Sequence, residues 1–299
     1  MLRTLVILAV FGFVATSPAV MRSRKDIEAF RQFLDNIKNG ENGERLLARK
    51  KAFPQANEEE ISGKFQGDIV LDDGDYEIML QEYSMGRNSY RTSSITVWPE
   101  DTVVFEFGDG EFDDQQKEAV WAAVRDIEAH SCVKFRYREP SDSVYVHLTG
   151  EPSGCYANIG YRKSRGAHSM NLARNTVGSG CFRHATIVHE WMHILGFLHM
   201  HATYDRDQYV QIHDENIATG SEHNFDIYTA SRVNNLGIEY DYVSCLHYGP
   251  YSFTGNGEPT IDIVFLLQNY TGDMGQRQYV TEKDWLRINR NYNCPGAWD

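Results

Sequence analysis

The string HEWMHILGFLH, from His189 to His199, sets strict geometric conditions on the fold of this chain. Residues four apart on an α-helix lie on one face, about 6 Å apart along the axis, so His189 and His193 could hold one metal ion together. On a straight helix His199 would lie roughly 15 Å beyond His189 and point elsewhere. Gly196 removes this conflict, because glycine adopts the left-handed conformation that ends helices. The spacing therefore predicts a helix, a break at Gly196 and a third ligand that returns to the metal.

This ligand set predicts a catalytic site with one zinc ion. Three histidines leave one zinc position open for water, whereas a structural site closes all four positions with protein ligands, usually thiolates. Glu190 follows the first ligand and can reach that water. Zinc lowers the pKa of the water towards about 7, and Glu190 is expected to accept its proton as general base. A chance HExxH string is the alternative, and the correctly spaced Gly196 and His199 argue against it.

The start of the chain predicts a signal peptide over residues 1–19. Arg3 provides a positive charge, residues 5–15 are apolar, and small residues follow. A membrane anchor is the alternative, but the apolar run is shorter than the ~20 residues of a spanning helix, and no later stretch qualifies. We therefore expect a secreted, extracellular protein that does not enter a membrane.

Charge and cysteine content narrow the partners and the compartment. The net charge of −13 argues against nucleic acid and anionic membrane surfaces, which attract clustered basic residues. The five cysteines allow at most two disulfides in an oxidising compartment, and spacing alone leaves their pairing open. Cys245 is the cysteine set apart from the others. The one glycosylation sequon begins at Asn269.

Hydrophobic patterns predict a mixed α and β architecture. Residues 20–87 are charged and contain no cysteine, whereas β-prone apolar segments begin near Ile95. Residues 113–128 carry apolar side chains at helical spacing, residues 184–197 form a second apolar helix, and a last helix is expected over 281–291. The order strand, helix, strand, strand indicates a mixed sheet with a helix against one face.

With these residues in place, the chain resembles the astacin family of metzincin zinc endopeptidases. The similarity extends from Phe65-Gln66-Gly67-Asp68, through segments 205–210 and 240–248, to the last cysteine. It implies an α+β, two-lobed fold. The upper lobe would hold a twisted mixed sheet and two long helices, and the lower lobe would be irregular. It also implies a pro-segment over 20–87 and a catalytic domain over 88–299 that hydrolyses polypeptides.

The resemblance also implies roles for single residues. Tyr248, in the segment SCLHY, would be an additional zinc ligand that swings away to stabilise the oxyanion. Asp68 would occupy the open zinc position in a latent precursor, although a Gly-Asp pair is otherwise most often a turn. A trypsin-like activator would cut near Arg87, so that the mature chain starts near Asn88 or Ser89. The family disulfides correspond to Cys132 with Cys294 and Cys155 with Cys181.

Substrate is expected to bind by strand addition to an edge strand over residues 168–172, at Ser169, Met170 and Asn171. Four positions depart from the family pattern: Met200 replaces glutamate, Thr203 replaces arginine, Leu246 replaces methionine, and Cys245 adds a thiol. They motivate an alternative, a catalytically silent secreted binding protein on the same fold. A different zinc hydrolase is a further alternative, which the FQGD and SCLHY segments disfavour.

Overall fold

A computed structural model describes residues 22–39, 48, 51–54, 59–84, 97–228, 230, 233–264 and 272–299. Three predictions concern residues outside these ranges: the signal peptide over 1–19, the sequon at Asn269 and the activation site at Arg87. Among the helices that the structure describes, none is long and apolar enough to cross a membrane.

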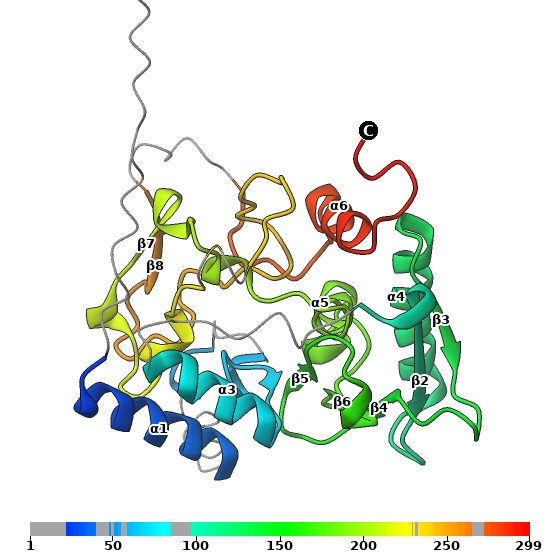
Figure 1. The fold of residues 1–299 in the computed structure, drawn as a ribbon, viewed down its shortest axis with the longest axis horizontal. Helices are drawn as coiled ribbons and strands as arrows, with labels where there is room; N and C mark the ends of the chain where they lie inside the picture. Colours follow the sequence, from blue (N-terminus) through cyan, green and yellow to red (C-terminus); the bar gives the residue numbers. More distant parts are fainter. Residues whose placement is uncertain are drawn as a thin grey trace, which may run out of the picture.

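The centre of the fold is a six-stranded mixed sheet with the order β1-β5-β6-β4-β2-β3 (Figure 1). Neighbouring strands β3, β2, β4 and β6 are parallel, β5 is antiparallel to β6, and β1 is parallel to β5. The strands are β1 Ile69–Val70, β2 Thr102–Phe107, β3 Lys134–Tyr137, β4 Tyr145–Thr149, β5 Cys155–Asn158 and β6 Ala167–Leu172. The mixed sheet confirms the predicted α+β class.

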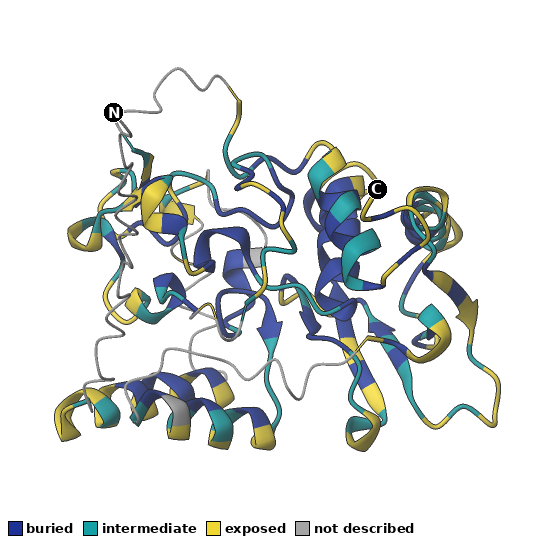
Figure 2. Ribbon diagram, turned by 45° about the horizontal axis from the view of Figure 1, so that its top comes forward, coloured by how far each residue is buried: buried dark blue, intermediate teal, exposed yellow. Residues whose placement is uncertain are grey.

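Helices α4 (Asp114–His130) and α5 (His184–Ile194) pack against each other and against the sheet. Asp113 begins α4 with a capping box, in which its carboxylate accepts from the backbone N–H of Gln116 at 2.8 Å. Both helices bury their apolar faces in one core with the inner side of the sheet (Figure 2). Each fully buried aliphatic side chain contributes about 1.5–3 kcal/mol. This layer corresponds to the predicted upper lobe.

The part of the chain after α5 is mostly irregular, as the resemblance predicted. It contains short helical turns, a two-stranded sheet of β7 (Val210–Ile212) and β8 (Ile261–Ile263), and α6 (Glu282–Asn291). Disulfides join Cys132 to Cys294 and Cys155 to Cys181, with sequence separations of 162 and 26 residues. The longer bridge ties the end of α4 to the segment after α6.

The described residues before β2 include two neighbouring helices and strand β1, which pack on the rest of the chain. Helices α1 (Arg24–Asn39) and α3 (Asp73–Ser84) pack together (Figure 1, lower left). Phe30, Phe33, Leu34 and Ile37 place the apolar face of α1 in a cluster that also holds Phe65, Ile69, Ile159, Ala202 and Tyr228. Apolar contacts therefore hold these helices on the rest of the chain.

The prediction that residues 168–172 form the edge strand is wrong. They belong to β6, which lies between β5 and β4, so both of its sides are occupied by neighbouring strands. Met170 and Asn171 are fully buried, and only Ser169 of the three proposed substrate contacts is exposed. The strand next to the edge is β5, and β1 covers it. Residues of β6 are therefore not available for strand addition.

Candidate active site

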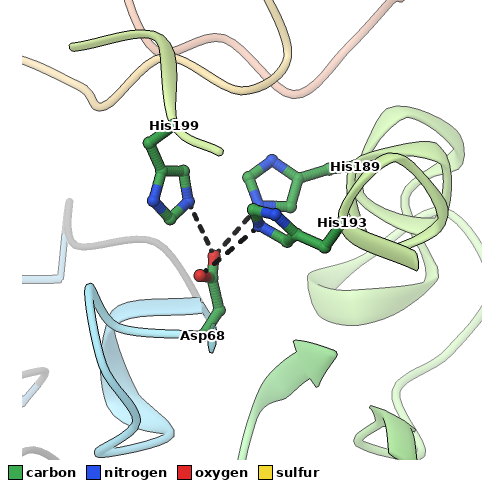
Figure 3. Close-up of side chains that lie close together, drawn as sticks. All are labelled: Asp68, His189, His193 and His199. Atoms are coloured by element: carbon green, nitrogen blue, oxygen red, sulfur yellow. Dashed lines mark hydrogen bonds and ion pairs between the residues drawn. The ribbon is translucent and has the colours of Figure 1, made fainter. Parts of the chain in front are cut away.

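The end of α5 brings the histidines together as the spacing predicts. The backbone N–H of Gly196 donates to the carbonyl of His193 at 2.9 Å, and that of Phe197 donates to Met192 at 3.0 Å. This pair of bonds is a Schellman motif, and Gly196 adopts its left-handed position with φ of 104°. The chain then reverses and returns His199 to the face of the helix that carries the other two ligands (Figure 3).

Asp68 meets all three histidines at their Nε2 atoms. Its Oδ2 lies 2.9 Å from His189 and 3.1 Å from His199, and its Oδ1 lies 3.5 Å from His193 (Figure 3). One ligand atom from each of the four residues lies within 4.8 Å of the other three. At most 2% of each residue is exposed. Asp68 and the three histidines thus form one buried group of four potential ligands.

Backbone carbonyls orient two of the imidazoles. Nδ1 of His189 lies 2.6 Å from the carbonyl oxygen of Cys245, and Nδ1 of His193 lies 2.7 Å from that of Phe197. Because a carbonyl only accepts, each Nδ1 carries the proton and each Nε2 keeps a free lone pair towards Asp68. Asp284 holds the Cys245 carbonyl in place, since its carboxylate accepts from the Cys245 N–H at 3.0 Å.

The group fits a zinc ion by its chemistry and by one buried atom. Oδ1 of Asp68 is buried without a hydrogen-bond partner among the described residues, which is costly for a carboxylate oxygen unless a cation satisfies it. Burial opposes ionisation of Asp68, but its interactions with His199, His193 and His189 outweigh burial and hold the pKa of Asp68 well below its usual value. Burial also lowers the pKa of His199 to about 4, which leaves it neutral. Neutral imidazoles and a carboxylate are ligands that zinc accepts.

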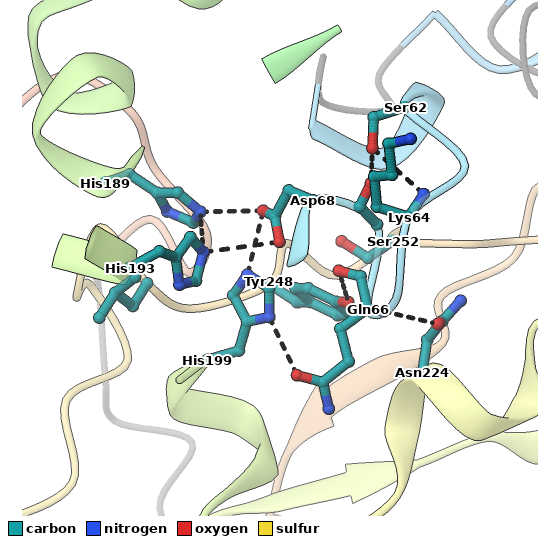
Figure 4. Close-up of polar contacts among 12 residues, drawn as sticks. Ser62, Lys64, Gln66, Asp68, His189, His193, His199, Asn224, Tyr248 and Ser252 are labelled. Carbon is teal, nitrogen blue, oxygen red and sulfur yellow. Dashed lines mark hydrogen bonds and ion pairs between the residues drawn. The ribbon is translucent and has the colours of Figure 1, made fainter. Parts of the chain in front are cut away.

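Gln66 connects the Asp68 loop to Tyr248 and His199 (Figure 4). Its carbonyl accepts a hydrogen bond of 2.5 Å from the hydroxyl of Tyr248, and its Oε1 lies 3.2 Å from Nδ1 of His199. Burial and the nearby Asp68 raise the pKa of Tyr248 well above its usual value, so its hydroxyl remains a donor. Gln66 has a left-handed φ of 47°, which is strained for a residue with a Cβ.

Sequence reasoning did not identify Gln66 or Asp284 as functional residues. Gln66 lies inside the FQGD segment, which was the available signal. Asp284 lies in the first turn of the last helix, three residues after the N-cap Thr281 as in a capping box, but its contact with residues 244 and 245 spans about forty positions.

Glu190, the predicted general base, is fully buried on α5.

Of the four departures from the family pattern, three are buried apolar contacts: Met200, Leu246 and Cys245 are 7%, 2% and 0% exposed. The thiol of Cys245 donates to the sulfur of Met192 at 3.5 Å, and burial raises its pKa well above the usual value. These contacts support the interpretation of Cys245 as a small hydrophobic residue. Thr203 donates to Asn235 at 2.5 Å.

The mixed sheet, the helix with its glycine break and the three histidines define a zinc protease. A family model described as Astacin, a peptidase family, matches residues 90–293. Zinc metalloproteinase nas-4 of Caenorhabditis elegans is 31% identical over 242 residues, which cover 79% of this chain and 71% of the relative. Seminal metalloprotease 1 of Drosophila melanogaster is 35% identical over 240 residues, with 79% and 88% covered.

A solved structure shows the same fold. High choriolytic enzyme 1, a hatching enzyme zinc-protease from Oryzias latipes, aligns with a TM-score of 0.59 and 28% identity, covering 68% of this chain and 96% of its own. The chain belongs to the astacin family and is a zinc metalloprotease that acts on peptide substrates.

Proposed function

We propose that this chain is the precursor of a secreted endopeptidase, and that Asp68 keeps the precursor latent. The observation that carries the proposal is the position of the Asp68 carboxylate, within 3.5 Å of Nε2 of all three histidines. A carboxylate in this place excludes both water and a substrate carbonyl from the ligand group. We assign residues 1–19 to a signal peptide, 20–87 to the pro-segment and 88–299 to the catalytic domain.

The pro-segment also blocks the strand that would bind substrate. Strand β1 pairs with β5, with Ile69 opposite Ala157 and Val70 opposite Asn158. When β1 leaves, the outer edge of β5 has free backbone donors and acceptors for an extended polypeptide. We propose β5 as the substrate-binding strand, because it borders the histidine group on the same sheet edge that Asp68 approaches.

The chain's own residues supply the rest of the chemistry. The three histidines would hold zinc, and bound zinc supplies Lewis acidity that acidifies water and polarises a carbonyl oxygen. Glu190 accepts a proton from the attacking water and returns it to the leaving amine. Once the Gln66 carbonyl has left, the Tyr248 hydroxyl is free to donate a hydrogen bond to the developing oxyanion, or to serve as a further zinc ligand before substrate binds.

Secretion and activation complete the proposal. The two disulfides persist in an oxidising compartment, which agrees with an extracellular location. Cleavage near Arg87 by a trypsin-like protease would separate residues 20–87 from a domain whose family match begins at residue 90. The sequon at Asn269 is a candidate glycosylation site of the secreted form.

Four samples test the proposal on casein and on a quenched peptide: the precursor, the trypsin-treated precursor, the treated sample with a chelator, and treated Glu190→Gln. Activity should appear on treatment and disappear on chelation. The variant should retain its zinc but lose about 10²–10⁴ in kcat/KM, the usual contribution of a general base. A treated, zinc-loaded protein that cleaves no substrate would refute the proposal and favour the silent binding protein.

A further inference from the structure

A second charged cluster joins the pro-segment to the catalytic domain beyond the carboxyl end of β5. Arg162 and Arg165 lie in the turn after β5, and Asp72 and Asp75 lie after β1 with the same three-residue spacing. Nη1 of Arg162 is 2.7 Å from Asp72 Oδ2, and Nη2 of Arg165 is 3.0 Å from both carboxylates. Nη2 of Arg162 also contacts Asp75. Each arginine thus binds both aspartates.

With residues 72–75 in place, three of the four side chains are largely withdrawn from water, whereas that of Asp72 is 34% exposed. The side chains of Arg165 and Arg162 are 6% and 15% exposed, and that of Asp75 is fully buried. Ions in such positions require partners of opposite charge, because their own hydration has been lost. The two guanidinium groups therefore form a site built for carboxylates, which differs from a solvated basic surface.

Contacts within the catalytic domain fix the backbone of the turn at Arg162 and one nitrogen of the Arg165 guanidinium. The backbone N–H of Arg162 donates to Nε2 of the buried His168 at 3.0 Å, and Nη1 of Arg165 donates to the carbonyl of Ile159 at 3.5 Å. These contacts involve catalytic-domain residues alone, so removal of the pro-segment leaves them in place. The turn is pre-organised for its ligand.

The position of the cluster relates it to the substrate cleft. Strand β1 lies along β5 with Val70 opposite Asn158, and Asp72 follows two residues later. Asp68 meets the histidines, and Asp72 meets the arginines four residues further along. A substrate that pairs with β5 as β1 does would therefore place a side chain beside the arginines about four residues, or roughly 13 Å, from its group that meets the histidines. A substrate on β5 therefore passes the two arginines.

We propose that Arg162 and Arg165 form a subsite of the mature enzyme for acidic side chains of the substrate. This inference rests on the proposed function, because Asp72 and Asp75 must first leave with the pro-segment. The ligand is an aspartate or glutamate of a polypeptide, whose carboxylate fits the planar guanidinium fork as Asp72 does. The acidic residue lies about four positions from the cleaved bond, on the side facing the carboxyl end of β5.

Paired peptides test the subsite on the trypsin-matured enzyme. Each pair of quenched peptides carries Asp or Asn about four residues from the cleaved bond, on its amino side in one series and its carboxyl side in another. In one series, kcat/KM should favour Asp by about tenfold or more, the usual contribution of a charged hydrogen bond. High salt should reduce this ratio. The ratio is measured on the wild-type enzyme, so it does not depend on whether a variant folds.

Two variants then locate the effect. Arg162→Gln with Arg165→Gln should reduce the Asp-to-Asn ratio to about one. Lys163→Gln removes an exposed charge from the same turn and should keep the wild-type ratio. The proposal is overturned by an enzyme that cleaves both peptides of every pair equally, or by a double variant that retains the preference. Cleavage of the Asn peptides shows that the proposed function stands in either case, whereas cleavage of no peptide refutes both proposals.

Discussion

Replacement of Asp75 by asparagine should release the proposed latency without any change to the histidine group. The Asp75 side chain is fully buried and contacts both Arg162 and Arg165. Asparagine keeps the volume and one acceptor oxygen but removes the charge. Loss of one partner of a buried ion pair costs 3–5 kcal/mol, and the remaining Asp72 carboxylate reduces this figure to about 2–3 kcal/mol here. Pro-segment docking should therefore weaken by about 30- to 150-fold.

The measurement is the peptidase activity of the intact precursor, divided by that of the same sample after trypsin treatment. Trypsin removes the substituted segment, so the treated variant and treated wild type have identical sequences and serve as the internal standard. Asp73→Asn is the matched control, because Asp73 is 85% exposed and pairs only with the exposed Lys38 among the ion pairs described. Such surface pairs contribute about 0–1 kcal/mol, so the relative activity of the intact control precursor should rise by no more than about fivefold. An equal rise in the relative activity of both intact variants would refute the reasoning about the buried cluster.

Two further predictions concern stability. Loss of the Cys132–Cys294 bridge, by serine at both positions, should lower the free energy of unfolding by about 5 kcal/mol, against about 3–4 kcal/mol for Cys155–Cys181, because the first closes the longer loop. Guanidinium unfolding measures both, and an equal or reversed order would contradict the chain-entropy account. Burial opposes ionisation of Asp72, but the Asp75 N–H and the two arginines lower its pKa below the usual 3.8. Its contribution is therefore present above pH 3.8 and lost as pH falls through the lowered pKa, so precursor and Asp72→Asn should unfold at increasingly similar temperatures in acid.

The ligands of the metal site were predictable because their spacing in the sequence determines how they can lie on a helix and after its end. His189 and His193 share a helix face, and Gly196 has to reverse the chain for His199 to join them. The position of Asp68 could not be predicted from sequence spacing. It contacts His189 across 121 residues, and no local pattern encodes such a contact, so its role came from the family resemblance alone.

The edge strand was wrongly predicted for a physical reason. The prediction assigned the edge to residues 168–172, whereas the strand that β1 covers, β5, has only four residues without clear alternation and includes the disulfide-bonded Cys155. Which strand lies at an edge depends on the order of all strands, and that order is a long-range property. The Asp72–Asp75 and Arg162–Arg165 pairs were missed similarly, since their matching spacing is meaningful only once β1 is known to lie on β5.

The pairing of β1 with β5 has a consequence for folding and storage. A sheet edge with free backbone groups is a template on which other chains can add strands, and such edges promote aggregation. While β1 remains in place, the outer side of β5 is paired, and β1 itself has only two residues, so this end of the sheet offers little strand to another chain. In the proposed maturation, loss of residues 20–87 would expose the outer edge of β5. The proposed pro-segment would thus limit strand pairing between copies of the chain, and the intact precursor would be the form suited to high concentration.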